Sequence, residues 1–225
     1  MNQPAAGDDR PVIDYYFSVL SDWAYMGGER FENLARRHNA RINHLPMKLA
    51  QLYEGTGGIV LQKRSVQRQD YRVIELERWR DKLGMPITLH PKYYPTNDTL
   101  AACSIIAAAQ LGLDAGRLAN LLHRAIWAEE QDLSDEGTLR RIIGALTPRP
   151  ETVLDAARSP EALQTLERNT REAGERGVFG SPFYIFEGQI YWGQDRLDFL
   201  DEQLARNAAR RLAQRAVNSP RSASG

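Results

Sequence analysis

Cysteine is almost absent from this chain: Cys103 is the only one among 225 residues. A single cysteine excludes an internal disulfide, a two-cysteine redox couple and a zinc site built from several thiolates. The four histidines (His38, His44, His90 and His123) lack the spacing of metal ligands, and no P-loop, GxSxG or HExxH motif is present. We therefore expect no bound metal, and we assign Cys103, which lies in an apolar run, to the core.

The sequence also lacks an excess of charge of either sign, because 29 Lys and Arg residues balance 29 Asp and Glu residues. A chain without net positive charge has no general attraction for a nucleic-acid backbone or an anionic membrane. No apolar run approaches the roughly 18 residues that span a membrane, and the N-terminus does not resemble a signal peptide. These absences predict a cytoplasmic protein with no nucleic-acid or membrane partner.

The front of the chain has the pattern of a β-α-β unit. Residues 12–20 are rich in β-branched and aromatic side chains, which predicts a strand buried on both faces and central in its sheet. The helical periodicity over 23–37 predicts a helix. Residues 41–45 predict a second short strand, which ends at a proline.

The remaining sequence is mostly helical and ends in a hairpin and a helix. Residues 177–186 and 189–192, joined by Glu187-Gly188, predict a β-hairpin. A final helix is expected through Leu204, with an Ala/Arg-rich run that extends it before a low-complexity tail. The helices expected in the middle cover 70–83, 99–111, 115–130, 135–145, 151–157 and 160–175.

This order of elements predicts an α/β fold, namely a thioredoxin-like domain interrupted by a large all-helical insertion. The thioredoxin-like domain is expected to be discontinuous, over residues 12–47 and 176–205, with the insertion at 48–175. Residues 1–11 and 206–225 are expected to be flexible or partly helical tails.

Three polar features would meet at one edge of such a sheet: Ser21 with Asp22, Ser181 with Pro182, and residues 193–196. Ser21 lies at a strand-to-helix turn, where a hydroxyl, unpaired N–H groups and the helix dipole favour an anion such as a thiolate. The alternative is a plain N-cap, which needs no ligand.

The other two features also allow two interpretations each. An ordinary trans bond is the commoner form of Ser181-Pro182, whereas a cis bond would turn the backbone of Ser181 toward an extended, peptide-like ligand. The N–H groups of Gly193, Gln194 and Asp195 can receive a carboxylate, and Asp195 can accept an ammonium. Alternatively, Asp195 only complements the helix dipole.

Together these motifs resemble one family. The segments Tyr15-Tyr16-Phe17-Ser18-Val19-Leu20-Ser21-Asp22-Trp23-Ala24-Tyr25, Gly177-Val178-Phe179-Gly180-Ser181-Pro182-Phe183 and Tyr191-Trp192-Gly193-Gln194-Asp195-Arg196-Leu197 are similar to those of the 2-hydroxychromene-2-carboxylate isomerases. These enzymes are related to kappa-class glutathione transferases and to DsbA-type oxidoreductases. The resemblance spans residues 12–204.

The resemblance implies a glutathione-dependent isomerase of aromatic-compound catabolism in which Ser21 replaces a redox cysteine and bonds the glutathione sulfur. It further implies that Ser181, before a cis Pro182, pairs with the cysteinyl backbone. The turn Gly193-Gln194-Asp195 would hold the γ-glutamyl end. Asp22 borders the thiol where the family usually has proline, and its carboxylate would oppose ionisation of that thiol.

The implied reaction is reversible addition of the thiolate to a conjugated enone of a small aromatic substrate. The candidates for substrate binding are Trp23, Tyr25, Lys48, Tyr53 and Trp192. For the aromatic residues the alternative is core packing, and for Lys48 it is solvation.

Two other functions remain open: a kappa-like glutathione transferase acting on electrophiles, and a non-catalytic thioredoxin-fold protein that binds a thiol or peptide. Gly58, where the family often has asparagine, can offer only its backbone to glutathione. The resemblance also implies a homodimer.

Overall fold

The computed structural model describes residues 9–218 and contains one four-stranded sheet within them. The strands are β1 (Val12–Phe17), β2 (Arg41–Pro46), β3 (Phe183–Phe186) and β4 (Gln189–Trp192). The helices are α1 (Asp22–Arg37), α2 (Leu49–Thr56), α3 (Val66–Leu83), α4 (Thr99–Gln110), α5 (Ala115–Trp127), α6 (Glu136–Gly144), α7 (Pro150–Ala157), α8 (Pro160–Glu175) and α9 (Leu197–Asn218). Short 3-10 helices cover Leu61–Lys63 (η1) and Gln194–Arg196 (η2).

The sheet has the strand order β2-β1-β3-β4, so β1 lies inside it as the sequence predicts. β1 pairs in parallel with β2 and antiparallel with β3, while β3 and β4 form the expected antiparallel hairpin. Both turn residues of this hairpin, Glu187 and Gly188, have positive φ, as the tightest hairpin turns require. The fold is thioredoxin-like, with a helical insertion between β2 and β3.

The side chains of β1 alternate between two cores, because successive residues of a strand point to opposite faces. Ile13, Tyr15 and Phe17 join the main core with buried side chains of α1, α4, α5 and α9. Tyr16 joins a smaller core with side chains of α2 and α8. The helical insertion therefore shares its core with the sheet, and the predicted domain boundaries stay a prediction.

Some boundaries differ from the sequence-based expectation. The first strand ends at Phe17, and Ser18 to Leu20 form a turn before α1. The strand expected over 177–186 is confined to β3. Helix α2 was missed because its short sequence buries only Leu52 and so carries little periodicity.

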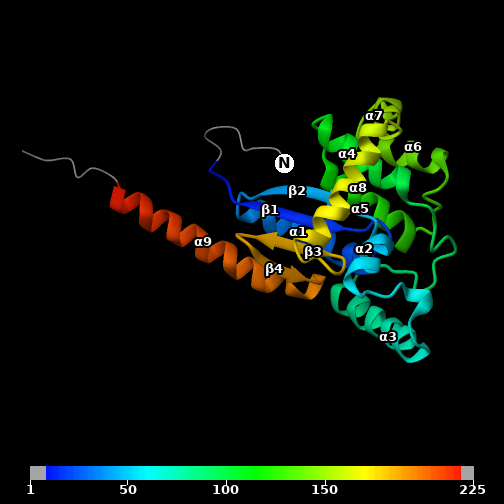
Figure 1. The fold of residues 1–225 in the computed structure, drawn as a ribbon, viewed down its shortest axis with the longest axis horizontal. Coiled ribbons are helices and arrows are strands. Elements are labelled where there is room, and N and C mark those ends of the chain that lie inside the picture. The colour runs from blue at the N-terminus through cyan, green and yellow to red at the C-terminus, as the bar shows by residue number, and fades with distance from the viewer. Residues whose placement is uncertain (1–8, 219–225) are drawn as a thin grey trace, which may run out of the picture.

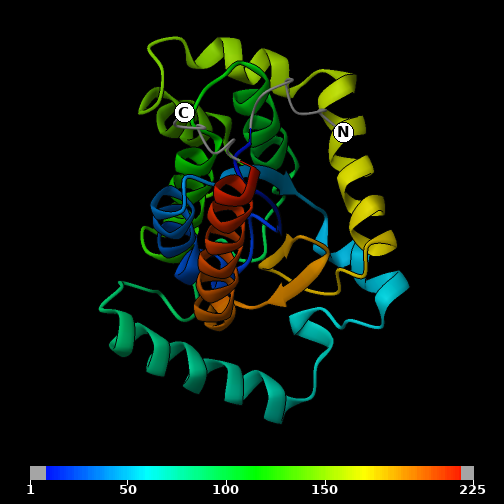
Figure 2. The same ribbon diagram turned by 90° about the vertical axis from the view of Figure 1, so that its left-hand side faces the viewer.

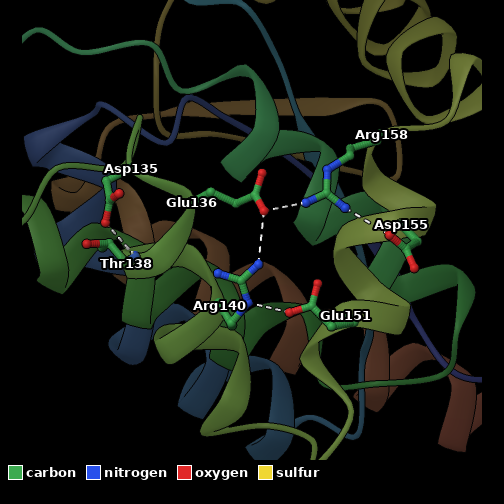
Figure 3. Close-up of polar contacts among 7 residues, drawn as sticks. All are labelled: Asp135, Glu136, Thr138, Arg140, Glu151, Asp155 and Arg158. Carbon is green, nitrogen blue, oxygen red and sulfur yellow. Dashed lines mark hydrogen bonds and ion pairs between the residues drawn. The ribbon is translucent and has the colours of Figure 1, made fainter.

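Ion pairs connect α6 to α7 on the outer surface of the insertion (Figure 3). Glu136 pairs with Arg140 at 3.0 Å and with Arg158 at 2.6 Å, and Arg140 also pairs with Glu151. Hydrogen bonding from Arg158 lowers the pKa of the Glu136 carboxyl. Because these side chains are exposed, we assign the network to the surface and not to a site.

Helices α3 and α9 are the elements that stand out from the body. In both views α3 lies at one side of the molecule and α6 and α7 at the other (Figure 1 and Figure 2). The end of α9 extends beyond the fold in Figure 1. Helix α9 continues to Asn218, and the tails expected at 1–11 and 206–225 stay a prediction; residues 1–8 and 219–225 lie outside the described part. No helix of residues 9–218 is long and apolar enough to cross a membrane. The cytoplasmic location and the homodimer stay predictions.

Candidate active site

A cavity of about 860 Å³ lies between the N-terminal end of α1, helices α2 to α4 and the turn after β4. This volume lies within the usual range for small-molecule sites. Pro182 and Tyr25 are the predicted site residues that do not line it. Those that do are Ser21, Asp22, Trp23, Lys48, Tyr53, Ser181, Trp192, Gly193, Gln194 and Asp195.

Ser21 is the N-cap of α1, and its hydroxyl makes two bonds within the protein. Oγ accepts the N–H of Ala24 at 3.1 Å and donates to the carbonyl of Ser181 at 3.3 Å. The N-cap interpretation is thus correct, yet Ser21 also lines the cavity. The two roles are compatible because a hydroxyl oxygen carries two lone pairs and a rotatable hydrogen.

Ser181 lies opposite Ser21 and precedes the proline for which the resemblance implies a cis bond. The Ser181-Pro182 bond is cis. The hydroxyl of Ser181 accepts the N–H of Ser18 at 3.0 Å, and the carbonyl of Pro182 accepts the N–H of Gly193 at 3.0 Å. The start of β3 therefore joins the β1–α1 turn to the turn after β4, which brings the three predicted motifs together.

Asp22 is nearly buried and forms an ion pair with Arg72 of α3. Its Oδ1 also accepts the N–H of Trp23 at 2.7 Å. The guanidinium of Arg72 lies 5.5 Å from the ring centre of Trp127, within the range of a cation–π contact. Asp22 therefore brings a negative charge beside Ser21, as the sequence predicts, and Arg72 balances that charge.

The turn after β4 holds its two polar side chains, Gln194 and Asp195, in different ways. Gln194 is buried, and its side chain accepts a hydrogen bond of 2.6 Å from Arg30 of α1. Neither Gln194 nor Asp195 caps a helix, since Gly193 precedes the 3-10 helix without a side-chain bond. Asp195 pairs with Arg196 at 2.9 Å. What this turn can offer a ligand is its backbone together with the carboxylate of Asp195.

Aromatic and basic side chains complete the wall. Tyr53 lies against Gly58, where an added Cβ would come within 1.9 Å of the ring; a bare backbone at Gly58 is therefore what lets this ring lie there. Trp192 lies over Gly180 in the same way. The Tyr25 hydroxyl instead donates to the carbonyl of Pro86 at 2.6 Å. Tyr25 is buried and absent from the cavity wall, so the structure does not place it against a substrate in this cavity.

Several cavity residues were not found by sequence analysis, among them Arg72, Tyr94 and Asp98. Burial raises the pKa of Asp98 to about 6, with a smaller opposing effect from Lys48. Burial also raises the pKa of Tyr94. The only sequence signal at Asp98 is its position before helix α4, which indicates a cap and gives no hint of a cavity.

Comparison with known proteins shows the family to which this chain belongs. A family model described as "DSBA-like thioredoxin domain" matches residues 12–205. The chain is 28% identical over 195 residues to a 2-hydroxychromene-2-carboxylate isomerase of Sphingobium xenophagum, covering 86% of this chain and 97% of that protein. It is 25% identical to one of Pseudomonas putida, covering 87% and 95%. It is 20% identical to "Glutathione S-transferase kappa 1" of Caenorhabditis elegans, covering 86% and 91%.

Solved structures are similar in fold. A 2-hydroxychromene-2-carboxylate isomerase structure matches with a TM-score of 0.77 and 24% identity, covering 90% of this chain and 98% of that one. The cytosolic disulfide reductase DsbM of Pseudomonas aeruginosa, solved with GSH, matches with a TM-score of 0.64 and 14% identity, covering 90% and 99%.

Proposed function

Because this chain belongs to the DsbA-like thioredoxin domain family, we propose that it is a glutathione-dependent isomerase of aromatic-compound catabolism. Its substrate pair is 2-hydroxychromene-2-carboxylate and trans-o-hydroxybenzylidenepyruvate. The observation that carries the proposal is the hydroxyl of Ser21, on the cavity wall at the N-terminal end of α1. The relatives named as 2-hydroxychromene-2-carboxylate isomerases support the substrate class.

The donors and charges on the cavity wall suit glutathione, a peptide with one thiol, one ammonium and two carboxylates. The hydroxyl of Ser21 and the positive end of the α1 dipole favour a sulfur anion, whereas the N–H groups of Trp23 and Ala24 are already bonded within the protein. Asp195 offers a carboxylate for the ammonium, and Arg64 offers a cation for a carboxylate. The kappa transferase and the DsbM structure with GSH lend further support.

Bound glutathione would supply a thiolate that adds reversibly to the conjugated enone of the substrate, so that the resulting single bond can rotate. Ser21 supports this chemistry through its hydroxyl hydrogen, now donated to the Ser181 carbonyl over a long 3.3 Å. Rotation of that hydrogen would let the same oxygen donate to a sulfur anion. Ser21 thus stabilises the nucleophile and is not itself attacked.

The surrounding charges keep this position favourable for an anion. Asp22 would repel a neighbouring thiolate, but its pairing with Arg72 leaves the two side chains with no net charge. The dipole of α1 therefore acts on the thiol site without an opposing carboxylate. Trp23, Tyr53 and Trp192 supply aromatic surface on the same wall, and Lys48 is the proposed partner of a substrate carboxylate.

A kappa-like glutathione transferase is the second candidate, favoured by the similarity to the nematode protein. It would use the same thiolate and differ only in releasing the adduct as product. A protein that binds glutathione without turnover is the third. The three functions differ in what happens to glutathione: it is regenerated, released in the adduct, or only bound. The residues around Ser21 would be the same in all three.

The test is to follow 2-hydroxychromene-2-carboxylate by absorbance and NMR with purified protein, with and without glutathione. We expect equilibration with trans-o-hydroxybenzylidenepyruvate only when glutathione is present, with the glutathione concentration unchanged at the end. Accumulation of a glutathione adduct would favour the transferase instead. Glutathione binding without any conversion would exclude the isomerase on this substrate and favour the binding protein.

A further inference from the structure

His123 of α5 is a fully buried polar side chain that the mechanism above does not use. Its Nε2 lies 3.2 Å from the carbonyl oxygen of Ser18. A carbonyl can only accept a hydrogen bond, so Nε2 carries the proton. Nδ1 has no hydrogen-bond partner in the described part of the chain. Burial lowers the pKa of the ring to about 4, so His123 is neutral at neutral pH.

Ser18, the residue that His123 contacts, lies in the turn between β1 and α1 and makes hydrogen bonds that hold this turn. Its carbonyl also accepts the N–H of Ser21 at 3.1 Å. Its own N–H donates to the hydroxyl of Ser181 at 3.0 Å. The turn that presents Ser21 is therefore held on one side by the loop before β3 and on the other by α5 of the insertion.

Packing alone does not account for a histidine at this position. The imidazole contacts the Phe17 ring edge-on at 5.7 Å between centroids, an environment that an apolar side chain of similar size would also fill. Such a side chain would avoid burying an unpaired Nδ1, which is unfavourable. What it would lose is the bond to Ser18.

We infer that His123 is a positioning residue for Ser21, acting from α5 through the carbonyl of Ser18. The inference rests on the proposed role of Ser21 at the thiol site. His123 touches neither the sulfur nor the substrate. By fixing the Ser18 peptide, it fixes where the N–H and hydroxyl of Ser21 lie relative to the cavity.

Two substitutions separate this role from simple packing. His123→Met keeps the volume and removes the donor, whereas His123→Gln retains an N–H donor at a similar reach. Tyr15→Phe is the matched control, because Tyr15 is buried in the same core with an unpartnered hydroxyl and lies outside the cavity wall. The measurements are kcat and KM with glutathione and the chromene carboxylate, and hydrogen exchange of the Ser21 amide by NMR.

For His123→Met we expect kcat to fall at least tenfold, KM values to change less than threefold, and the Ser21 amide to exchange at least tenfold faster. His123→Gln should stay within about threefold of the wild type in all three, as should Tyr15→Phe. Unchanged kcat and amide exchange in a folded His123→Met variant would overturn the inference and leave the isomerase proposal intact. If the wild type itself lacks isomerase activity, the proposed function fails, and amide exchange still decides whether His123 holds the turn.

Discussion

Asp22 in the first turn of α1 and Arg72 of α3 form an ion pair whose side chains are only 9% and 10% exposed. The pair connects the helix that carries Ser21 to a helix that otherwise stands at the side of the molecule (Figure 1). Because both charges are withdrawn from water, each depends on the other for compensation. The ion pair therefore has both a structural and an electrostatic effect on the thiol site.

Arg72→Gln should expose the thiol site to the unbalanced charge of Asp22. We expect the pKa of the bound glutathione thiol to rise by about one unit, because a nearby like charge disfavours the thiolate. We also expect the free energy of unfolding to fall by about 3 kcal/mol, since one partner of a buried pair is lost. Thiolate absorbance as a function of pH and urea unfolding measure these changes.

Adding Asp22→Asn to Arg72→Gln removes the unpaired charge. We expect the double variant to recover most of the low thiol pKa and most of the free energy of unfolding. Arg78→Gln is the matched control, because Arg78 lies on the same helix with a 64% exposed side chain. A double variant no better than Arg72→Gln alone would show that the charge of Asp22 is not the cause.

Ser21→Ala should lower turnover about 10²- to 10³-fold, the usual effect of losing one preorganised donor, while the Kd for glutathione changes far less. The variant also loses a helix cap, which costs about 1 kcal/mol of stability. Ser159→Ala provides the control, because Ser159 caps α8 through the same kind of bond, 3.2 Å to the N–H of Ala162. Equal activity in Ser21→Ala and Ser159→Ala would rule out a catalytic role for Ser21.

Gly180→Ala should disturb the aromatic wall without touching the thiol site. An added Cβ would come within 2.3 Å of the Trp192 indole nitrogen, so the indole must move. We expect KM for the aromatic substrate to rise about threefold to tenfold while kcat changes little. Gly144→Ala meets no atom within 4 Å and should behave as the wild type. An unchanged KM would show that Trp192 does not contact the substrate.

Asp98→Asn should stabilise the protein more at neutral pH than at acid pH. In the folded state the pKa of Asp98 is about 6, above its usual value of 3.8. The folded state therefore holds the proton more tightly, so this group stabilises the fold below pH 4 and loses that effect as the pH rises through 6. At about 1.4 kcal/mol per unit, the variant should gain roughly 2–3 kcal/mol at pH 7.

Urea unfolding of both proteins at pH 4.5 and pH 7 measures this difference. His123 lowers the free energy of unfolding on acidification, because its folded pKa of about 4 is below its usual 6.5. This contribution is the same in both proteins and cancels when they are compared. Asp81→Asn, at a 71% exposed carboxylate, should show no such pH dependence. A gain from Asp98→Asn that is the same at both pH values would contradict the raised pKa of Asp98.

Much of the fold was predictable because it depends on local patterns. The β-branched and aromatic run of β1, the turn at Glu187-Gly188 and the helical periodicities predicted most of the elements, and their order predicted the thioredoxin-like topology. The site motifs were predictable for a related reason. Ser21, Ser181 and Gly193 lie at the ends of sheet strands, and strands of one sheet bring their ends to a common edge.

The contacts made from the insertion were not predictable, because no local pattern encodes them. Arg72 has the sequence appearance of a surface residue on a charged helix, and only the tertiary fold places it against Asp22. The contact between His123 and the Ser18 carbonyl also comes only from the tertiary fold, because no sequence motif joins the two residues. Gln194 lines the cavity that the motif predicts, but no local pattern indicated that its side chain accepts a hydrogen bond from Arg30.

The central claim is that this protein activates the thiol of glutathione at Ser21, and ultraviolet difference spectroscopy during a glutathione titration at neutral pH tests it most directly. We expect a saturable thiolate absorbance that is lost in Ser21→Ala and kept in Ser159→Ala. Absence of that signal in the wild type, with no binding of glutathione by calorimetry, would contradict the account.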